Sequence, residues 1–361
     1  MTTRKPAAPT RRVETGLVPP RPLGFALTRG DERHRVFPTA PPMKSDRRSF
    51  LTASVAAAAA SLLGGAGTVA ATPAPARRGR TKLAVATYSY WHFKTTKVPV
   101  ETVMDRAAEL GAEGVDILHR QMDIGERAPL DAAGRAYLRR LKRHAFSRGL
   151  SICCLSTHQS FVKADRAELA KEVEHTRKCI ELAHELGCPS IRINTGRWGT
   201  TRSFDALMAN RGIEPVLPGH TEDEGFKWCI DGITQCLAKA EECGVVLALE
   251  NHWGLARTAA GLLRILDAIK SPWLGALMDT GNFLEDPYPQ LEAMAPRTVY
   301  VQAKTYHGGG EWYTLDLDYP RIAGILARAG YTGWVGLEME GKEDAATAVP
   351  KSLATLRAAF G

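Results

Sequence analysis

The sequence lacks a Cys-x-x-Cys pair, and none of its 7 cysteines precedes residue 150. Without cysteines at that spacing, a cysteine-bound zinc site is not expected. The odd number also excludes a framework in which every cysteine forms an intramolecular disulfide. Cys229, Cys236 and Cys243 recur every seven residues in one helix-like stretch, which predicts that they share a helical face. We interpret them as buried core thiols.

The sequence also lacks a net positive charge outside its first 80 residues. The chain of 361 residues has a formal net charge of +8, but residues 1–80 alone hold 14 Lys and Arg against 4 Asp and Glu. The remaining residues hold 33 against 35, a net charge of −2. A nucleic-acid-binding domain built on global positive charge therefore loses its main support, and we expect no nucleic-acid partner.

Residues 43–76 have the pattern of an export signal. An arginine pair at 47–48 precedes a weakly apolar, Ala- and Gly-rich run over 52–71, and small residues follow at 74–76. The pair resembles the twin-arginine signal, which predicts export to the periplasm by the twin-arginine export machinery. A transmembrane anchor is the weaker alternative, because the glycines of 64–67 lower the apolar character of the run.

The segment before this signal, residues 1–42, is rich in Pro and Arg and has no periodicity. We expect it to be disordered and interpret Met43 as the true start of translation. Cleavage after Ala76 would leave residues 77–361 as a barrel domain with a net charge of +1.

Short apolar runs alternate with segments of helical periodicity from Lys82 onward. Strands are expected at Leu83–Thr87, Gly114–Ile117, Ser151–Leu155, Ser190–Ile193, Val245–Leu249, Gly275–Met278, Thr298–Val301 and Val335–Leu337. Helices are expected at 100–110, 131–148, 167–186, 223–242, 258–269, 288–294, 319–329 and 345–359. Eight such units predict an α/β fold, a single-domain (β/α)8 TIM barrel. The open doubly wound alternative usually carries a Gly-rich turn after its first strand, which residues 87–91 do not provide.

Acidic residues follow three of the last four predicted strands. Glu250, Asp279 and Glu338 come after the fifth, sixth and eighth strands, and Gln302 comes after the seventh. Chemistry in such barrels takes place at the carboxyl ends of the strands. Carboxylates buried there are costly unless a cation compensates them. The set would suit one divalent metal, Mn²⁺ or Mg²⁺ before Zn²⁺ or Co²⁺, although each acid could instead cap a helix or pair with an arginine.

Further polar residues lie at the same predicted face and could bind a substrate. These substrate-binding candidates are His158, Arg192, Asn194, His252, Asn282 and Lys304. Arg192 and Lys304 could hold a hydroxyl or an acidic group, whereas His252 could equally pack beside Trp253. Asp116, near the end of the second strand, could be a site residue or a supporting hydrogen-bond partner.

Four segments carry a resemblance to a known family. The segments LALENHWG (247–254), ALMDTGNF (276–283), VYVQAK (299–304) and GYTGWVGLEMEG (330–341) resemble the sugar phosphate isomerase/epimerase family of xylose-isomerase-like barrels. The resemblance covers roughly residues 82–360. It implies a divalent metal held by Glu250, Asp279, Gln302 and Glu338. At the third ligand position the ketose epimerases have His and the hydroxypyruvate isomerases have Gln, as here.

The resemblance implies a metal-dependent isomerase or epimerase acting on a sugar, keto-sugar or related hydroxy-carbonyl compound through an enediolate. Glu250 and Glu338 would act as base and acid.

A lyase or dehydratase using the same base is the main alternative, and a non-catalytic sugar-binding protein is a weaker one. An endonuclease is disfavoured because Asn282 and Gln302 stand where that relative needs histidines. The sequence does not decide whether the protein forms a homo-oligomer.

Overall fold

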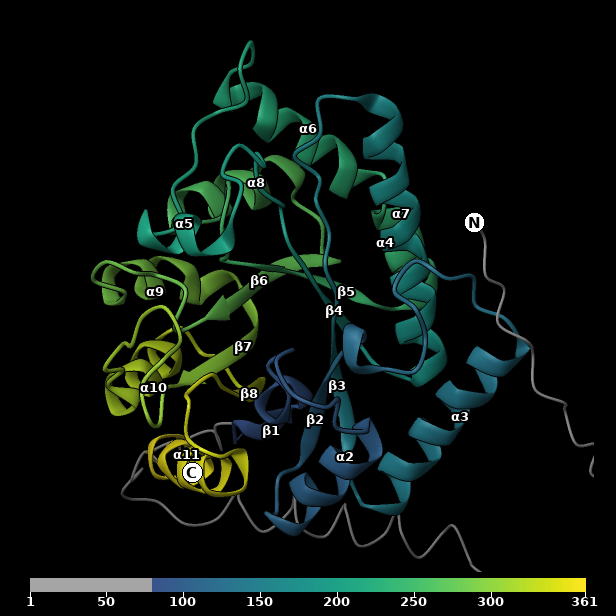
Figure 1. Cartoon of the computed structure of the whole chain (residues 1–361), viewed down its shortest axis with the longest axis vertical. Coiled ribbons are helices and arrows are strands. Elements are labelled where there is room, and N and C mark those ends of the chain that lie inside the picture. Colours follow the sequence, from purple (N-terminus) through teal and green to yellow (C-terminus); the bar gives the residue numbers. More distant parts are fainter. Residues whose placement is uncertain (1–79) are drawn as a thin grey trace, which may run out of the picture. The chain divides into compact units, whose positions relative to one another are not determined.

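Eight parallel strands close into a barrel in which each strand pairs with its sequence neighbour and β1 pairs with β8 (Figure 1). The computed structural model describes residues 80–361. The predicted export signal at 43–76, the segment 1–42 before it and the predicted start of the barrel domain at residue 77 lie outside the described residues. Between 80 and 361 the predicted single-domain (β/α)8 barrel is confirmed.

All eight predicted strands are present. They are β1 (Lys82–Ala86), β2 (Gly114–Leu118), β3 (Ser151–Ser156), β4 (Ser190–Ile193), β5 (Val246–Glu250), β6 (Leu274–Asp279), β7 (Thr298–Thr305) and β8 (Trp334–Met339). The strand β7 continues past its predicted end at Val301, so Gln302 and Lys304 lie within the strand and not after it. Two residues apart on one strand, they point to the same side of the sheet.

Helices follow the strands around the barrel (Figure 1). They are α2 (Val100–Glu109), α3 (Ala132–Ser147), α4 (Arg166–Leu186), α5 (Phe204–Ala209), α6 (Glu222–Thr234), α7 (Leu237–Cys243), α8 (Ala259–Ile269), α9 (Tyr288–Met294), α10 (Tyr319–Arg328) and α11 (Ala345–Phe360), with 3₁₀ turns η1 (Thr87–Tyr90), η2 (His119–Gln121) and η3 (Ala295–Arg297). The helix α4 shows the usual boundaries: the Asp165 side chain accepts hydrogen bonds from the first turn, and Gly187 closes the helix at φ +72°.

The helix predicted at 223–242 is two helices, α6 and α7. The break lies where a side chain of α4 contacts a backbone carbonyl group of the junction. The Gln235 carbonyl accepts a hydrogen bond from Arg177 on α4 at 2.9 Å, and the Gln235 side chain donates to the Asp231 carbonyl at 3.1 Å. The prediction of one face of buried thiols is therefore wrong in part: Cys229 and Cys236 are fully buried, but Cys243 at the end of α7 is only half-buried.

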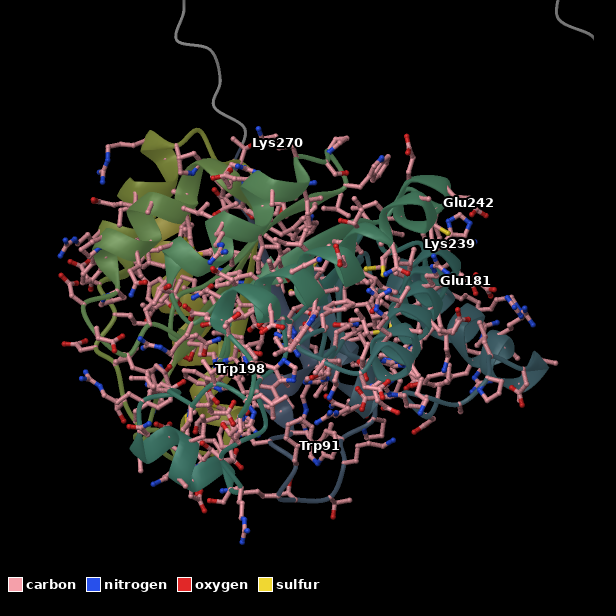
Figure 2. The ribbon with its side chains drawn as sticks, turned by 90° about the horizontal axis from the view of Figure 1, so that it is seen from above. Trp91, Glu181, Trp198, Lys239, Glu242 and Lys270 are labelled. Carbon is pink, nitrogen blue, oxygen red and sulfur yellow. The ribbon has the colours of Figure 1, made fainter. Side chains whose placement is uncertain are left out.

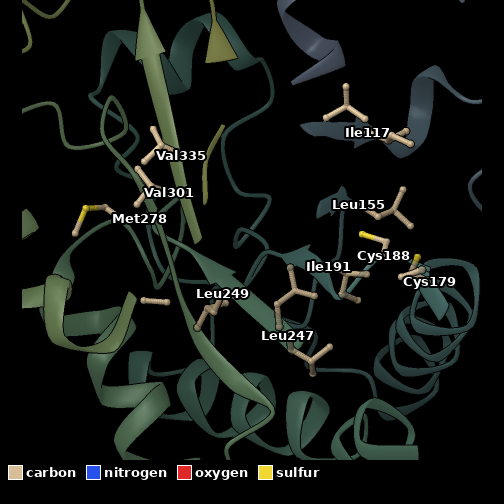
Figure 3. Packing of buried hydrophobic residues seen from close by; sticks show 14 of the residues in the cluster. Ile117, Leu155, Cys179, Cys188, Ile191, Leu247, Leu249, Met278, Val301 and Val335 are labelled. Atoms are coloured by element: carbon tan, nitrogen blue, oxygen red, sulfur yellow. The ribbon is translucent and has the colours of Figure 1, made fainter. Parts of the chain in front are cut away.

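The main core lies between the strands and the surrounding helices (Figure 3). It is built from alternate strand residues such as Ile191, Leu247 and Leu249, which are fully buried, together with the apolar faces of the helices. Parallel strands covered by helices on their outer face need this apolar content. Among residues 80–361, no helix is both long and apolar enough to cross a membrane.

The surface of the barrel domain carries exposed ion pairs. Lys239 on α7 lies 3.5 Å from Glu181 on α4 and 2.8 Å from Glu242 (Figure 2). Exposed pairs of this kind contribute about 0–1 kcal/mol each, so the fold does not depend on them.

A second, smaller apolar cluster includes Ala84 of β1, Ala248 of β5 and the large, buried Tyr300 of β7. Gly336 of β8 lies against Tyr300, and a methyl group added at Gly336 would overlap the tyrosine hydroxyl. The small residue on β8 therefore makes room for the large one on β7.

We expect Gly336→Ala to lower the free energy of unfolding by about 1–3 kcal/mol, because the added methyl group overpacks this cluster. Adding Tyr300→Phe removes the overlapping oxygen and is expected to recover part of the loss. Thermal unfolding measures both. The matched control is Gly324→Ala on α10, where the added methyl group meets only the tip of Arg328 and helix propensity favours Ala. A Gly336→Ala variant as stable as the wild type would contradict the packing argument.

Candidate functional site

Three carboxylates lie at the carboxyl ends of three of the last four strands. Glu250 is the last residue of β5, Asp279 is the last of β6, and Glu338 is next to last in β8. Their exposed fractions are 1%, 0% and 4%. Buried carboxylates are costly unless cations or hydrogen bonds compensate them, so the partners of each one decide what the site can do.

Lys304 supplies one compensating cation from β7. Its Nζ atom lies 2.6 Å from Glu340 Oε2, 3.5 Å from Glu338 Oε2 and 3.6 Å from Asp279 Oδ2. Lys304 and Glu338 are also register partners on β7 and β8. Burial opposes the charge on Lys304, but the surrounding carboxylates outweigh burial and raise its pKa. Lys304 is therefore a fixed ammonium group among the carboxylates.

Arg192 on β4 supplies the second cation. Its Nε atom lies 3.6 Å from Glu250 Oε2, and its Nη1 atom lies 3.9 Å from Glu338 Oε1. Burial opposes the charge on the guanidinium, but Glu250, Glu338 and Asp116 outweigh burial and raise the pKa of Arg192. Arg192 thus links the carboxylates of β5 and β8.

The two cations do not balance the negative charge around them. Burial, only partly offset by Lys304, raises the pKa of Asp279 well above its ordinary value. Burial also raises the pKa of Glu338 to about 7. For Glu250 burial acts in the same direction, but Arg192, His252 and Lys304 outweigh it and lower the pKa. With Glu340 included, four carboxylates face two cations, and a further cation would be favoured there.

Hydrogen bonds hold Glu250 on both of its oxygens. Asn194 Nδ2 donates to Oε2 at 2.6 Å, and Asn282 Nδ2 donates to Oε1 at 3.4 Å and to the Asn251 carbonyl at 3.0 Å. Both asparagines were predicted to bind substrate, and the structure brings both to Glu250. Their contacts fix the orientation of the Glu250 carboxylate.

The two predicted histidines also lie at this site. His158 Nε2 is 3.1 Å from Arg192 Nη2, and His158 Nδ1 is 3.3 Å from Glu126 Oε1. Burial lowers the pKa of His158 to about 4, so the ring is neutral, donating to Glu126 and accepting from Arg192. Burial likewise lowers the pKa of His252 to about 4 despite the nearby Glu250. The His252 ring centroid lies 5.2 Å from that of Trp253, so this histidine packs beside the tryptophan, and its binding of substrate stays a prediction.

The predicted metal ligands fit a divalent cation by their donor atoms. Among residues 80–361, no three His, Cys, Asp or Glu side chains converge closely enough to form a metal cage by themselves. Yet Asp279 Oδ2 and Gln302 Oε1 are buried and have no hydrogen-bond partner. Asp279 and Gln302 are register partners on β6 and β7. Buried oxygens left without partners are costly, and oxygens are the ligands that hard divalent cations take.

Three residues of the site were not among the predicted site residues. Glu340 anchors Lys304 and lies 3.4 Å from the Tyr88 hydroxyl, and Tyr313 lies 3.5 Å from Asn282 Oδ1. Glu340 could have been found, because it lies two residues after Glu338 in an extended segment and so points to the same side. Tyr88 comes from the short 3₁₀ turn η1 and Tyr313 from a loop, and neither segment has a periodicity that indicates a direction.

Solved structures of sugar epimerases are similar to this barrel. The 3-keto-D-glucoside 4-epimerase YcjR from E. coli gives a TM-score of 0.60 at 16% identity over 77% of this chain and 100% of that chain. The D-psicose 3-epimerase from Clostridium cellulolyticum H10, crystallised with D-tagatose, gives 0.61 at 13% identity over 78% of this chain and 99% of that chain. An IolI protein with a bound zinc atom gives 0.58 at 14% identity over 77% and 96%. At these identities the likeness is one of fold.

No curated protein sequence matches the chain significantly. The sequence profile of one protein family, described as Xylose isomerase-like TIM barrel, matches residues 104–359. That match spans most of the chain and includes Glu250, Asp279, Gln302 and Glu338. The chain belongs to the xylose isomerase-like TIM barrel family.

Proposed function

We propose that the protein is a metal-dependent sugar isomerase or epimerase that moves a proton next to a carbonyl group of a sugar, keto-sugar or related hydroxy-carbonyl compound. The observation that carries this proposal is the pair Glu250 and Glu338, buried on separate strands and joined through Arg192, beside oxygens of Asp279 and Gln302 that accept no hydrogen bond. Sugar epimerases among the proteins of similar fold support the substrate class.

Glu250, Asp279, Gln302 and Glu338 would hold the metal, with Mn²⁺ or Mg²⁺ favoured and Zn²⁺ or Co²⁺ tolerated. The zinc atom in the IolI structure, a protein of similar fold, supports a divalent cation here. When bound, such a cation would polarise a substrate carbonyl and stabilise the negative charge of the enediolate.

The protein side chains would carry the proton. Glu250, oriented by Asn194 and Asn282, would take the proton from the carbon next to the carbonyl. Glu338, on β8, would return a proton to the other face or to the neighbouring carbon, so one C–H bond breaks and one forms. Lys304 and His252 would donate hydrogen bonds to substrate oxygens, and Arg192, oriented by its contact with His158, would hold a hydroxyl group at the β3–β4 side.

We expect the purified protein to retain about one divalent metal ion per chain when Mn²⁺, Zn²⁺ and Mg²⁺ are available during expression. Elemental analysis of the protein measures this. An Asp279→Ala variant is expected to lose the metal, because it removes one of the two unpartnered oxygens. The matched control is Asp267→Ala, which removes an exposed carboxylate paired with Arg297 on the outer helices. Wild-type protein without stoichiometric metal would count against the metal centre.

Deuterium exchange identifies the substrate and the reaction together. The enzyme is incubated in D₂O with a panel of keto- and aldo-sugars, and each recovered sugar is analysed by mass spectrometry and NMR. We expect deuterium at the carbon next to the carbonyl in both the substrate and its isomer, because Glu250 exchanges its proton with solvent. Loss of water or of a glycosidic leaving group would identify the lyase instead. Binding without exchange for every sugar would contradict an enzyme of either kind.

A further inference from the structure

The side-chain amide of Gln302 has only one of its two ends satisfied. Its Nε2 atom donates to Asp116 Oδ2 at 3.0 Å and lies 3.2 Å from Ser156 Oγ. Its Oε1 atom is buried and has no hydrogen-bond partner. Asp116 is on β2 and Ser156 on β3, so the contact crosses the barrel interior to reach β7.

The hydrogen atoms available around Gln302 fix which end of the amide faces Asp116 and Ser156. Ser156 Oγ lies 2.8 and 3.0 Å from the two oxygens of Asp116, so its single hydrogen is committed to that carboxylate. Toward Gln302, both the Ser156 hydroxyl and the Asp116 carboxylate, which accepts from Ser156 on each of its oxygens, present lone pairs. A reversed amide would bring its oxygen against two acceptors, so Gln302 must present its NH₂ group there.

The same constraint directs Gln302 Oε1 away from Asp116 and Ser156. Gln302 is the register partner of Asp279, whose own Oδ2 atom is buried without a hydrogen-bond partner. Two adjacent strands therefore each present an unsatisfied oxygen at the same level of the barrel. A side-chain amide that was free to rotate could rest with its NH₂ group toward the site before a cation arrives, and turning it would then cost part of the binding free energy.

We propose that Asp116 and Ser156 are positioning residues that lock the Gln302 amide with its oxygen turned toward the cation site. The inference rests on the proposed metal centre and adds two residues that touch neither metal nor substrate. Asp116 and Ser156 act on the metal through Gln302, in the way that carboxylates orient histidine ligands in other metal sites. The cross-barrel contact thereby makes a neutral side chain a competent ligand.

The test is the affinity of the metal-stripped, folded protein for Mn²⁺, measured by calorimetric titration. Ser156→Ala removes the hydroxyl but keeps the Asp116 charge, and we expect it to weaken Mn²⁺ binding about 10-fold. Asp116→Asn, whose amide can offer a donor toward Gln302 and permit the reversed orientation, is expected to weaken binding by about 10–100-fold. The matched control is Ser190→Ala, which loses a buried hydroxyl that donates to the Cys153 carbonyl at 2.8 Å. It is expected to bind Mn²⁺ like the wild type.

A Gln302→Met background separates positioning from simple electrostatics. If Asp116 and Ser156 act through Gln302, the substitutions Ser156→Ala and Asp116→Asn cause no further loss of Mn²⁺ affinity when Gln302 is already Met. Equal losses in both backgrounds would overturn the positioning role, as would unchanged affinity of both single variants. If Asp116→Asn fails to fold, the Ser156→Ala pair alone decides the question. A wild-type protein that binds no Mn²⁺ would overturn the metal centre itself and this inference with it.

Discussion

Glu250→Gln is expected to lower kcat by about 10²–10⁴-fold while the protein stays folded, because the substitution removes the proposed base and keeps its shape. The carboxamide cannot take a proton from carbon, and it also replaces one of the two oxygens that Asn194 and Asn282 hold. The measurement is the rate of solvent deuterium incorporation into the sugar that the wild type exchanges. Circular dichroism and thermal unfolding verify the fold of the variant.

The matched control for Glu250→Gln is Glu181→Gln on the outer face of α4, where the carboxylate makes only an exposed ion pair with Lys239 (Figure 2). The same conservative change there is expected to leave the exchange rate unaltered. Glu338→Gln, the proposed acid, is expected to block formation of the isomer. It would leave deuterium exchange into the substrate less affected, because removal of the first proton does not require Glu338. Near-normal isomer formation in both glutamate variants would contradict the two-glutamate mechanism.

The fold could be predicted because each strand is a short apolar run and each helix has its own periodic face. The alternation of apolar and polar residues that identifies each strand or helix is contained within that element. Once the elements form a closed barrel, its topology places the strand-end residues Glu250, Asp279 and Glu338 at one end. The sequence did not indicate the division of the 223–242 helix, where the Gln235 carbonyl accepts a hydrogen bond from Arg177 on another helix, because a contact between helices leaves no local signal.

The sequence predicted which residues lie at the site, but it did not predict which of their side chains contact one another. The sequence indicated that Asn194 and Asn282 face the site, but it contains no signal that both side chains contact Glu250. The contact of Gln302 with Asp116 joins residues 186 positions apart in the chain. Contacts of this separation depend on the closed barrel and cannot be read from spacing. The roles assigned to these residues, export through the twin-arginine machinery and the oligomeric state stay predictions.

Arg192→Met is expected to lower the free energy of unfolding by about 3–5 kcal/mol, because it removes one partner from a buried ionic cluster. Arg192 lies 3.6 Å from Glu250 and 3.9 Å from Glu338, and its side chain is almost fully buried. Methionine fills a similar volume but leaves both carboxylates with less compensating charge. In a domain of this size the expected fall in Tm is about 6–20 °C. Thermal unfolding of the metal-stripped protein measures it.

A second substitution tests whether uncompensated charge is the cause. In the double variant Arg192→Met with Glu338→Gln, one of the two carboxylates that face Arg192 is neutral, so the double variant is expected to be more stable than the sum of the single effects implies. The matched control is Arg328→Met, which breaks an exposed pair with Glu292 and is expected to cost less than about 1 kcal/mol. Strictly additive effects in the double variant would mean that Arg192 does not compensate the charge of Glu338, so that its electrostatic role would be limited to Glu250.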